Sequence, residues 1–281
     1  MRLSLNVNGD LPVEDLIDRV KIAESAGIGQ IWIGELEQFK DPVEVAEEIE
    51  PETNAEICVL LSTSRNPCSE IITTSKKYTV GLILGRAKDL ELFISCLKKL
   101  KEVAETEMVY AGVSGPIITE RASEYADGLL FNYVYPEYVE WIEGYMKLGK
   151  ETGILTSSFG PSLLLPSPFY EELLIAAAIV MQSNPFFLKT FNLQEMSQRI
   201  PADLSKLVRL RQARQSVTEN PEFLQMREYS QDLLKLFTIS GDLEEVRNRI
   251  SQLLQLCDNV VLGDPFFRDI ESLKTLKRLK I

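Results

Sequence analysis

The sequence contains no histidine, the most common general base and metal ligand of enzymes. Its absence excludes Ser–His and Cys–His nucleophile pairs and His-liganded metals. Acid–base chemistry would therefore have to come from Asp, Glu, Tyr, Lys or Cys. Cysteine is also scarce, and no Cys-x-x-Cys pair suggests a zinc site. We expect reduced structural thiols at Cys58, Cys68, Cys96 and Cys257.

Long hydrophobic runs are missing as well. The longest, 173–181, is too short to cross a bilayer, and residues 1–8 alternate apolar and polar side chains as a first strand does, unlike a secretory signal. Basic residues are outnumbered, with 30 against 42 acidic ones, giving a net charge of −12. This balance argues against binding to nucleic acid or to anionic membranes. We expect a cytoplasmic protein that acts on a small-molecule substrate.

The chain does contain a repeated pattern of strands and helices. Its 281 residues, 45% of them hydrophobic, can form one large α/β core or two smaller ones. About eight strand–helix units recur, which matches a (β/α)8 TIM barrel; a doubly wound open sheet is the alternative. The predicted strands are 3–7, 28–35, 55–61, 78–84, 109–113, 128–132, 153–158 and 258–265.

Residues 162–220 interrupt this rhythm, because they are rich in helix formers and broken by prolines. We predict a single barrel domain over residues 1–281, with 162–220 as a helical insertion after the seventh strand. In such barrels functional groups gather at the carboxyl ends of the strands. This rule nominates Asn6, Glu35, Ser62, residues 112–115, Asn132, Thr156 and Asp264.

The stretch 109–116 predicts a strand, a tight turn and a helix. Residues 109–113 are apolar and β-favouring, Ser114 can cap a helix, Gly115 permits an unusual turn, and a helix can begin at Pro116. Unpaired N–H groups at a helix start can bind phosphate or carboxylate. The turn is therefore a candidate anion site. The alternative is an ordinary turn without a ligand.

Several segments resemble the luciferase-like monooxygenase superfamily, in particular its coenzyme F-420-dependent branch, which includes methylenetetrahydromethanopterin reductase. The likeness covers most of the chain. The similar segments are 23–35 (AESAGIGQIWIGE), 66–67 (NP), 111–116 (AGVSGP), 126–132 (ADGLLFN), 241–246 (GDLEEV) and 259–263 (NVVLG).

This resemblance implies a barrel whose cofactor lies over the carboxyl ends of the strands and supplies the hydride chemistry. Coenzyme F-420 is the implied cofactor; FMN, or no cofactor at all, are the alternatives. A cis peptide near residues 61–63 would support the cofactor ring, and relatives commonly form homodimers. The implied cofactor-binding residues are Ser62, Thr63, Asn66, Gly112, Val113, Ser114, Gly115, Asn132 and Thr156.

The chain also departs from these relatives. Leu36 follows Glu35 where many relatives have histidine, and the first strand offers Asn6 and Asn8 where the reductase branch often has an acid. The segments 66–84 and 84–89 are shorter than usual, which could open the cofactor pocket or delete part of it. Two function classes therefore stand side by side. One is a hydride-transferring oxidoreductase, and the other is a degenerate barrel that binds or assembles without catalysis.

Glu35 is the candidate catalytic acid. It follows a strand apolar enough to be buried, so its carboxyl group is expected at the top edge of the barrel in partly desolvated surroundings. Desolvation favours the protonated form, which suits a proton donor beside a hydride acceptor. The alternative is a structural role, in which Glu35 binds a neighbouring loop or pairs with Arg65.

A basic cluster and an aromatic cluster each have two interpretations. The basic cluster is either a solvated helix face or a surface for an acidic partner or the polyglutamate tail of coenzyme F-420. It comprises Lys206, Arg209, Arg211 and Arg214. The aromatic cluster either lines a substrate pocket or packs a helix onto the barrel. It comprises Tyr133, Tyr135, Tyr138 and Trp141.

Overall fold

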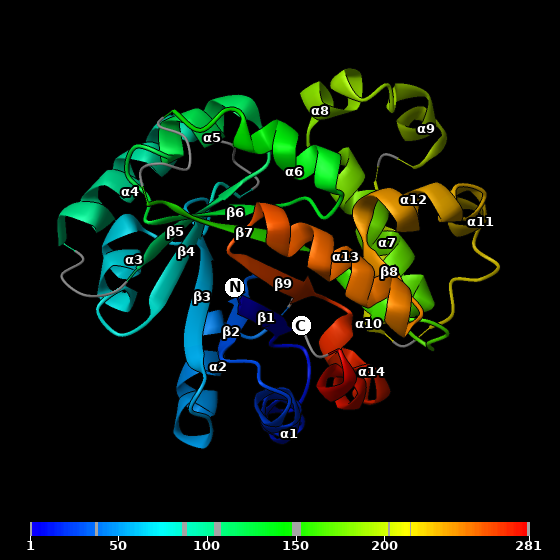
Figure 1. The fold of residues 1–281 in the computed structure, drawn as a ribbon, viewed down its shortest axis with the longest axis horizontal. Coiled ribbons are helices and arrows are strands. Elements are labelled where there is room, and N and C mark those ends of the chain that lie inside the picture. Colours follow the sequence, from blue (N-terminus) through cyan, green and yellow to red (C-terminus); the bar gives the residue numbers. More distant parts are fainter. Residues whose placement is uncertain are drawn as a thin grey trace.

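Parallel strands close into a barrel in the computed structural model, which describes residues 2–36, 39–85, 89–103, 108–147, 153–201, 203–213 and 215–279 (Figure 1). Closure occurs because β1 pairs with both β2 and β9, with Leu5 opposite Ile31 and Leu262, and because β6 pairs with β7. The predicted TIM barrel is confirmed and the open sheet is excluded. The barrel strands are β1 (Arg2–Asn8), β2 (Gln30–Gly34), β3 (Glu56–Ser62), β4 (Thr79–Ile83), β5 (Val109–Val113), β6 (Gly128–Phe131), β7 (Leu155–Leu164) and β9 (Asn259–Gly263).

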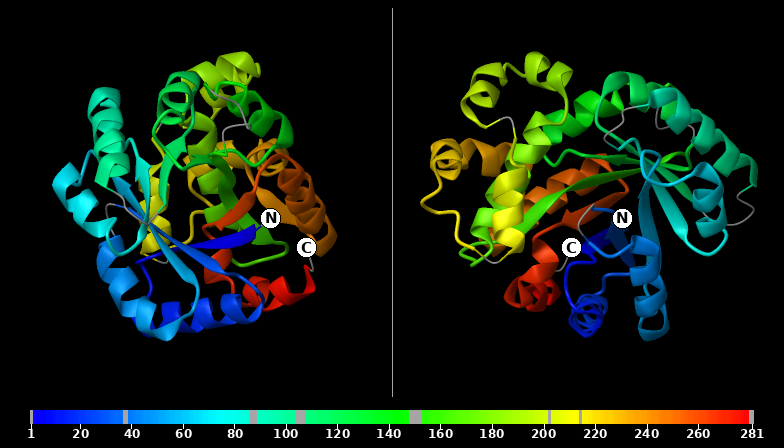
Figure 2. Two further views of the ribbon diagram at one scale, coloured as in Figure 1. Left: turned by 60° about the vertical axis from the view of Figure 1, so that its left-hand side comes forward. Right: turned by 180° about the vertical axis from the view of Figure 1, so that it is seen from behind.

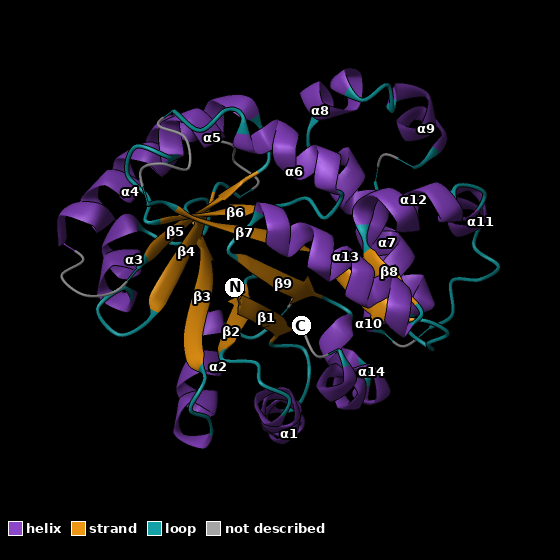
Figure 3. Cartoon of the chain, in the orientation of Figure 1, coloured by secondary structure: helices purple, strands orange, loops and turns teal. Residues whose placement is uncertain are grey.

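Helices surround the strands on the outside of the barrel (Figure 3). Each turns an apolar face inward; α1, for example, buries Leu16, Val20 and Ala23 at helical spacing. The helices α1 and α14, which are far apart in the sequence, pack together on the outside of the barrel (Figures 1 and 2). The barrel helices are α1 (Val13–Ser25), α2 (Pro42–Ile49), α3 (Cys68–Thr74), α4 (Leu90–Val103), α5 (Pro116–Ala122), α6 (Pro136–Glu143), α13 (Leu243–Leu256) and α14 (Ile270–Thr275), with 3-10 turns at Glu50–Glu52, Phe266–Arg268 and Leu276–Arg278.

The helical insertion follows β7 as predicted, but its limits differ. Strand β7 runs on to Leu164 instead of ending at 158, because its second half pairs with the short strand β8 (Ile239–Gly241). The insertion therefore begins later and continues beyond residue 220. It lies to one side of the barrel (Figures 1 and 2). Its helices are α7 (Tyr170–Gln182), α8 (Pro185–Thr190), α9 (Gln194–Arg199), α10 (Ser205–Gln212), α11 (Pro221–Arg227) and α12 (Ser230–Phe237).

A tryptophan fills the inside of the barrel. Trp32 is fully buried and meets Tyr110 edge-on, with ring centroids 5.2 Å apart. The space for it comes from Gly81 on β4, where a Cβ atom would stand 2.9 Å from Trp32 Cζ3 and 2.5 Å from Leu60 Cδ2. This interior is separate from the larger apolar core that packs the helices onto the strands.

The prediction that all four cysteines are reduced is wrong. Cys68, at the start of α3, and Cys96, on α4, form a disulfide with their Cα atoms 5.6 Å apart. The sequence did not reveal this pair because the barrel, not the spacing along the chain, places α3 beside α4. Cys58 and Cys257 are buried thiols, and burial raises the pKa of Cys58 well above its ordinary value. No helix in the described ranges is long and apolar enough to span a bilayer.

Candidate functional site

A cavity of about 580 Å³ opens at the carboxyl ends of the strands. Each barrel strand, from β1 to β7 and including β9, contributes at least one residue to the lining of this cavity. The site is thus at the end of the barrel where the sequence placed it, because all strands run in the same direction. No group of three or more potential metal ligands exists among the described residues.

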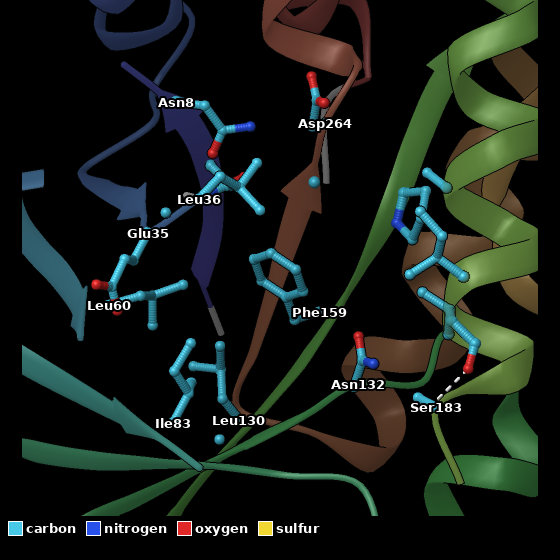
Figure 4. Close-up of a pocket in the computed structure, with 18 of the residues that line it drawn as sticks. Asn8, Glu35, Leu36, Leu60, Ile83, Leu130, Asn132, Phe159, Ser183 and Asp264 are labelled. Carbon is cyan, nitrogen blue, oxygen red and sulfur yellow. Dashed lines mark hydrogen bonds between the residues drawn. The ribbon is translucent and has the colours of Figure 1, made fainter. Parts of the chain in front are cut away.

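The floor and near wall of the cavity are apolar. Leu60, Ile83 and Leu130 come from β3, β4 and β6, and the ring of Phe159 projects between the strands (Figure 4). Such a surface suits a flat, apolar ring system, because burying apolar area is the main source of binding free energy in a closed pocket.

The opposite wall is one face of α7, which the sequence analysis did not assign to the site. The lining residues recur every three to four positions, as neighbours on a helix surface do. The apolar run 173–181 could have indicated that this helix lines the site, because a helix that is apolar on all sides has more apolar surface than one packing face requires. The residues on this face are Glu172, Ile175, Ala176, Ile179 and Val180, followed by the C-cap residue Ser183.

Amide side chains supply polar groups at the strand ends. Asn6 lines the cavity but donates a 3.1 Å hydrogen bond from Nδ2 to the carbonyl oxygen of Trp32. Asn8 and Asn132 also line the cavity, and the Asn132 amide points into it (Figure 4). Asn132 has no side-chain hydrogen bond within the described part of the chain, so its donor and acceptor are both available to a ligand.

Glu35 lies at the cavity edge, but its carboxylate turns toward β3. Oε2 accepts a 2.6 Å hydrogen bond from Ser62 N, and Oε1 accepts a 3.0 Å bond from Asn66 Nδ2. Arg65 Nε is 3.3 Å from Oε1. The expected burial is present, with only 4% of the side chain exposed. Two hydrogen-bond donors and one arginine thus contact the carboxylate, as in the structural alternative for Glu35.

The loop after β3 therefore contacts Glu35 and does not line the cavity. Ser62, Thr63 and Asn66, expected as cofactor contacts, do not line the cavity. Ser62 Oγ lies 3.0 Å from Ser64 Oγ, and Thr63 N donates to Ile83 O at 3.2 Å. The cis peptide expected at 61–63 is also absent. Within the described ranges, cis bonds precede Pro166 and Pro265.

The turn after β5 is partly in the site. Gly112, Val113 and Ser114 line the cavity, and α5 begins at Pro116 as predicted. Gly115, not Ser114, occupies the N-cap position, and neither provides a side-chain cap. Gly115 lies outside the cavity lining.

The helical insertion closes over this turn. Asn184, which caps α8, donates from Nδ2 to the carbonyl oxygen of Ser114, and Tyr133 Oη donates to the same oxygen at 2.5 Å. A Cβ atom on Gly115 would stand 2.6 Å from Asn184 Nδ2. Side chains of Tyr133 and Asn184 thus lie against the turn at Ser114 and Gly115.

Thr156 was expected at the carboxyl end of the seventh strand, and this placement is wrong. It lies near the amino end of β7, where its N donates to Asp258 Oδ2 at 2.8 Å. The error follows from the strand boundary: β7 extends six residues beyond the predicted end at 158, so Thr156 is at the floor of the barrel.

Arg268 lines the cavity between two carboxylates. Its guanidinium group pairs with Asp10 and, at 2.5 Å from Nε to Oδ1, with Asp264. Burial alone would lower the pKa of Arg268, but Asp264 and Asp10 together raise it. Burial is also the main influence on Asp10, whose pKa is raised despite the arginine. The cation is therefore fully engaged by the protein itself.

Arg211 is held in the same way on the other side of the cavity. Its Nη1 and Nη2 lie 2.9 Å from Glu171 and 2.7 Å from Glu172, which fixes α10 against α7. The members of the basic cluster therefore differ in their surroundings. Arg211 pairs with α7, Lys206 is 3.9 Å from Glu222, and Arg209 is exposed. Arg214 lies outside the described residues.

The aromatic cluster packs helices rather than lining the cavity. Tyr133 stacks on Phe187 of α8 with centroids 4.8 Å apart, and Tyr138 meets Phe191 at 4.5 Å. Trp141 also contacts Phe187. The packing interpretation is confirmed, but these aromatic partners belong to the helical insertion and not, as had been expected, to the barrel.

Comparisons with known proteins agree with this architecture. No known family model and no curated protein matches the chain. Among solved structures, the coenzyme F420-dependent tetrahydromethanopterin reductase from Methanopyrus kandleri is similar with a TM-score of 0.73 and 14% identity, covering 99% of this chain and 97% of that one. An F420-dependent secondary alcohol dehydrogenase, in complex with an F420–acetone adduct, has a TM-score of 0.63 and 11% identity, covering 99% and 98%.

A monooxygenase is similar as well. EDTA monooxygenase from Chelativorans sp. BNC1 has a TM-score of 0.62 and 12% identity, covering 100% of this chain and 93% of that one. At such low identity these matches establish the fold and leave the activity open. They agree with the fold that the resemblance implied: the chain shares its barrel fold with two F420-dependent enzymes and a monooxygenase.

Proposed function

We propose that the chain is an oxidoreductase that holds the planar ring of a deazaflavin or flavin in this cavity and transfers hydride to or from a small substrate. The observation that carries the proposal is the open, mostly apolar cavity of about 580 Å³, a volume typical of small-molecule and cofactor sites. Coenzyme F-420 is the first candidate, in keeping with two of the similar structures, and FMN is the second. The cofactor supplies the hydride chemistry, and the protein binds and orients.

The cavity fits the ring of such a cofactor better than its phosphate. Leu60, Ile83 and Leu130 offer apolar surface, and Asn132 offers an amide for the polar edge of a ring. By contrast, Arg211 and Arg268 are each held by two carboxylates. We therefore assign the ring to the cavity and leave the phosphate unassigned.

Glu35 is the proposed acid of the reaction. It is the carboxyl group that combines a place at the cavity with an almost fully buried side chain. Proton delivery from it requires Arg65 to move away. The side chain of Arg65 is 44% exposed, so its guanidinium group can move into solvent and be hydrated there. The role of Glu35 is thus coupled to the position of Arg65.

A barrel that binds a small molecule without catalysis is the second candidate. The observation that favours this second candidate is that both carboxylate oxygens of Glu35 already have partners in Ser62, Asn66 and Arg65. A group held in this way orients a loop without exchanging protons.

Cofactor titration separates the two candidates. Absorbance and fluorescence of the purified protein are recorded before and after adding coenzyme F-420 or FMN. We expect saturable binding that Ala176→Phe abolishes by filling the cavity, whereas Ala213→Phe, at an exposed position after α10, leaves it intact. Failure of both cofactors to bind the wild-type protein would overturn the oxidoreductase proposal and favour the binding barrel.

A further inference from the structure

We propose that the cavity selects an uncharged, largely apolar substrate and rejects anionic ones. As a statement about the substrate, this inference rests on the proposed function and names its substrate class. The binding preference itself belongs to the cavity and can be measured without cofactor or turnover. Three features carry it: the balance of charge, the ion pairs of the lining residues Arg211 and Arg268, and the apolar entrance.

The charge around the cavity is negative. Among the residues that the structure describes, five carboxylates surround three guanidinium groups when the lining residues are counted with their ion-pair partners. The carboxylates are Glu35, Asp10, Asp264, Glu171 and Glu172, and the cations are Arg65, Arg211 and Arg268. An anion entering this space meets an excess of like charge in a poorly solvated environment, where Coulomb repulsion is stronger than in water.

The arginines at the wall cannot compensate for this excess. Arg268 is held between Asp10 and Asp264, and Arg211 between Glu171 and Glu172. A ligand carboxylate or phosphate would have to displace a protein carboxylate from one of these pairs and leave it buried without a partner. Breaking a buried ion pair in this way is strongly unfavourable.

The entrance favours apolar ligands. Leu36 and Ile179, on opposite sides of the cavity, are 47% and 46% exposed although both are large aliphatic residues. Both side chains belong to the cavity lining and extend its apolar surface outward, and contiguous apolar surface of this kind is typical of a ligand-binding groove. Inside, the Asn132 amide can donate to or accept from one uncharged polar group, such as a carbonyl or a hydroxyl.

Two matched fluorescent probes test the preference. N-phenyl-1-naphthylamine is uncharged, and 8-anilinonaphthalene-1-sulfonate carries the same aromatic groups with an added sulfonate. Both are titrated into the cofactor-free protein. We expect the uncharged probe to bind at least about tenfold more tightly, as expected for an unpaired charge near like charges at an intermediate dielectric. Equal or tighter binding of the sulfonate would overturn the proposal.

Variants locate the effect in the cavity. Glu172→Gln removes one lining carboxylate and should strengthen sulfonate binding several-fold with little change for the uncharged probe, whereas Glu102→Gln, on the exposed side of α4, changes the same net charge and should alter neither. Ala176→Phe should weaken both probes; if it does not, the probes bind elsewhere and the cavity is not the selective site.

A second control concerns Arg86 and Lys88, which follow the lining residue Gly85 in the sequence and lie outside the described residues. The double variant Arg86→Gln/Lys88→Gln should keep the ratio of the two affinities. If the wild-type protein prefers the sulfonate and the double variant loses this preference, the proposal is contradicted. If the protein binds a cofactor but binds both probes equally tightly, the proposed substrate class is refuted and the oxidoreductase proposal remains intact.

Discussion

Glu35 Oε2, directly after β2, accepts a 2.6 Å hydrogen bond from the backbone N–H of Ser62 at the end of β3. The side chain of one strand end thus holds the backbone of the next at the rim of the cavity. Asn66 and Arg65 complete the arrangement from the following loop. Glu35 is therefore both the proposed acid and the anchor of the loop after β3, and substitutions can separate the two roles.

Glu35→Gln should lower turnover by roughly 10²–10⁴-fold, the loss typical of a missing general acid, with cofactor affinity little changed. Glutamine keeps the size of the side chain and one acceptor oxygen for Ser62 N, but it has no proton to transfer. Steady-state kinetics and a cofactor titration measure the two quantities.

Arg65→Gln is the matched control, because it removes the ion pair and leaves the carboxyl group in place. We expect this variant to keep turnover within about threefold of the wild type if Glu35 is a proton donor that must be released. Equal losses in the two variants would show that Glu35 acts only by positioning the loop.

The disulfide should contribute to stability. Joining Cys68 to Cys96, 28 residues apart, restricts the unfolded chain, and loop-closure entropy predicts a contribution of up to about 3.6 kcal/mol. Cys68→Ser should therefore lower the urea midpoint, and dithiothreitol should lower that of the wild type in the same way. The reductant should have no further effect on Cys68→Ser; if it does, another cysteine is responsible.

Gly81 should be intolerant of any side chain. Gly81→Ala places a Cβ 2.5 Å from Leu60 and 2.9 Å from Trp32 inside a closed barrel, so we expect a loss of about 1–3 kcal/mol in the free energy of unfolding. Gly29→Ala is the matched control, since a Cβ there meets nothing within 4 Å. Chemical denaturation of both variants tests the difference, and equal stabilities would mean that the barrel interior can repack around the added methyl group.

Gly115 tests whether the turn after β5 binds phosphate or the insertion. Gly115→Val should push Asn184 away and lower stability by about 1–2 kcal/mol, as should Asn184→Ala, which also removes the cap of α8. We expect the two variants to have equal effects on cofactor affinity. A loss of affinity for F-420 or FMN confined to Gly115→Val would restore the anion site predicted from the sequence.

Much of the fold could be predicted from local pattern. Apolar segments such as 31–34 and 109–113, each followed by a helix with one apolar face, specify parallel strands with crossover helices, and parallel strands bring all their carboxyl ends to one edge. This rule correctly placed Glu35, Gly112, Asn132 and Asp264 at the cavity. It failed for Thr156, because an apolar pattern does not mark where a strand continues through a second pairing with β8.

The charge of the site was decided only by the tertiary structure. In the sequence, Arg211 belongs to a basic cluster and Arg268 is isolated, and nothing in either neighbourhood shows that each is held by two carboxylates. Those partners come from α7, from the start of the chain and from the end of β9, and the disulfide likewise joins two helices that only the barrel places side by side. Local pattern determines which residues form strands and helices because it depends on near neighbours along the chain; ion pairs and pocket walls depend on distances across the barrel, which exist only after it has closed.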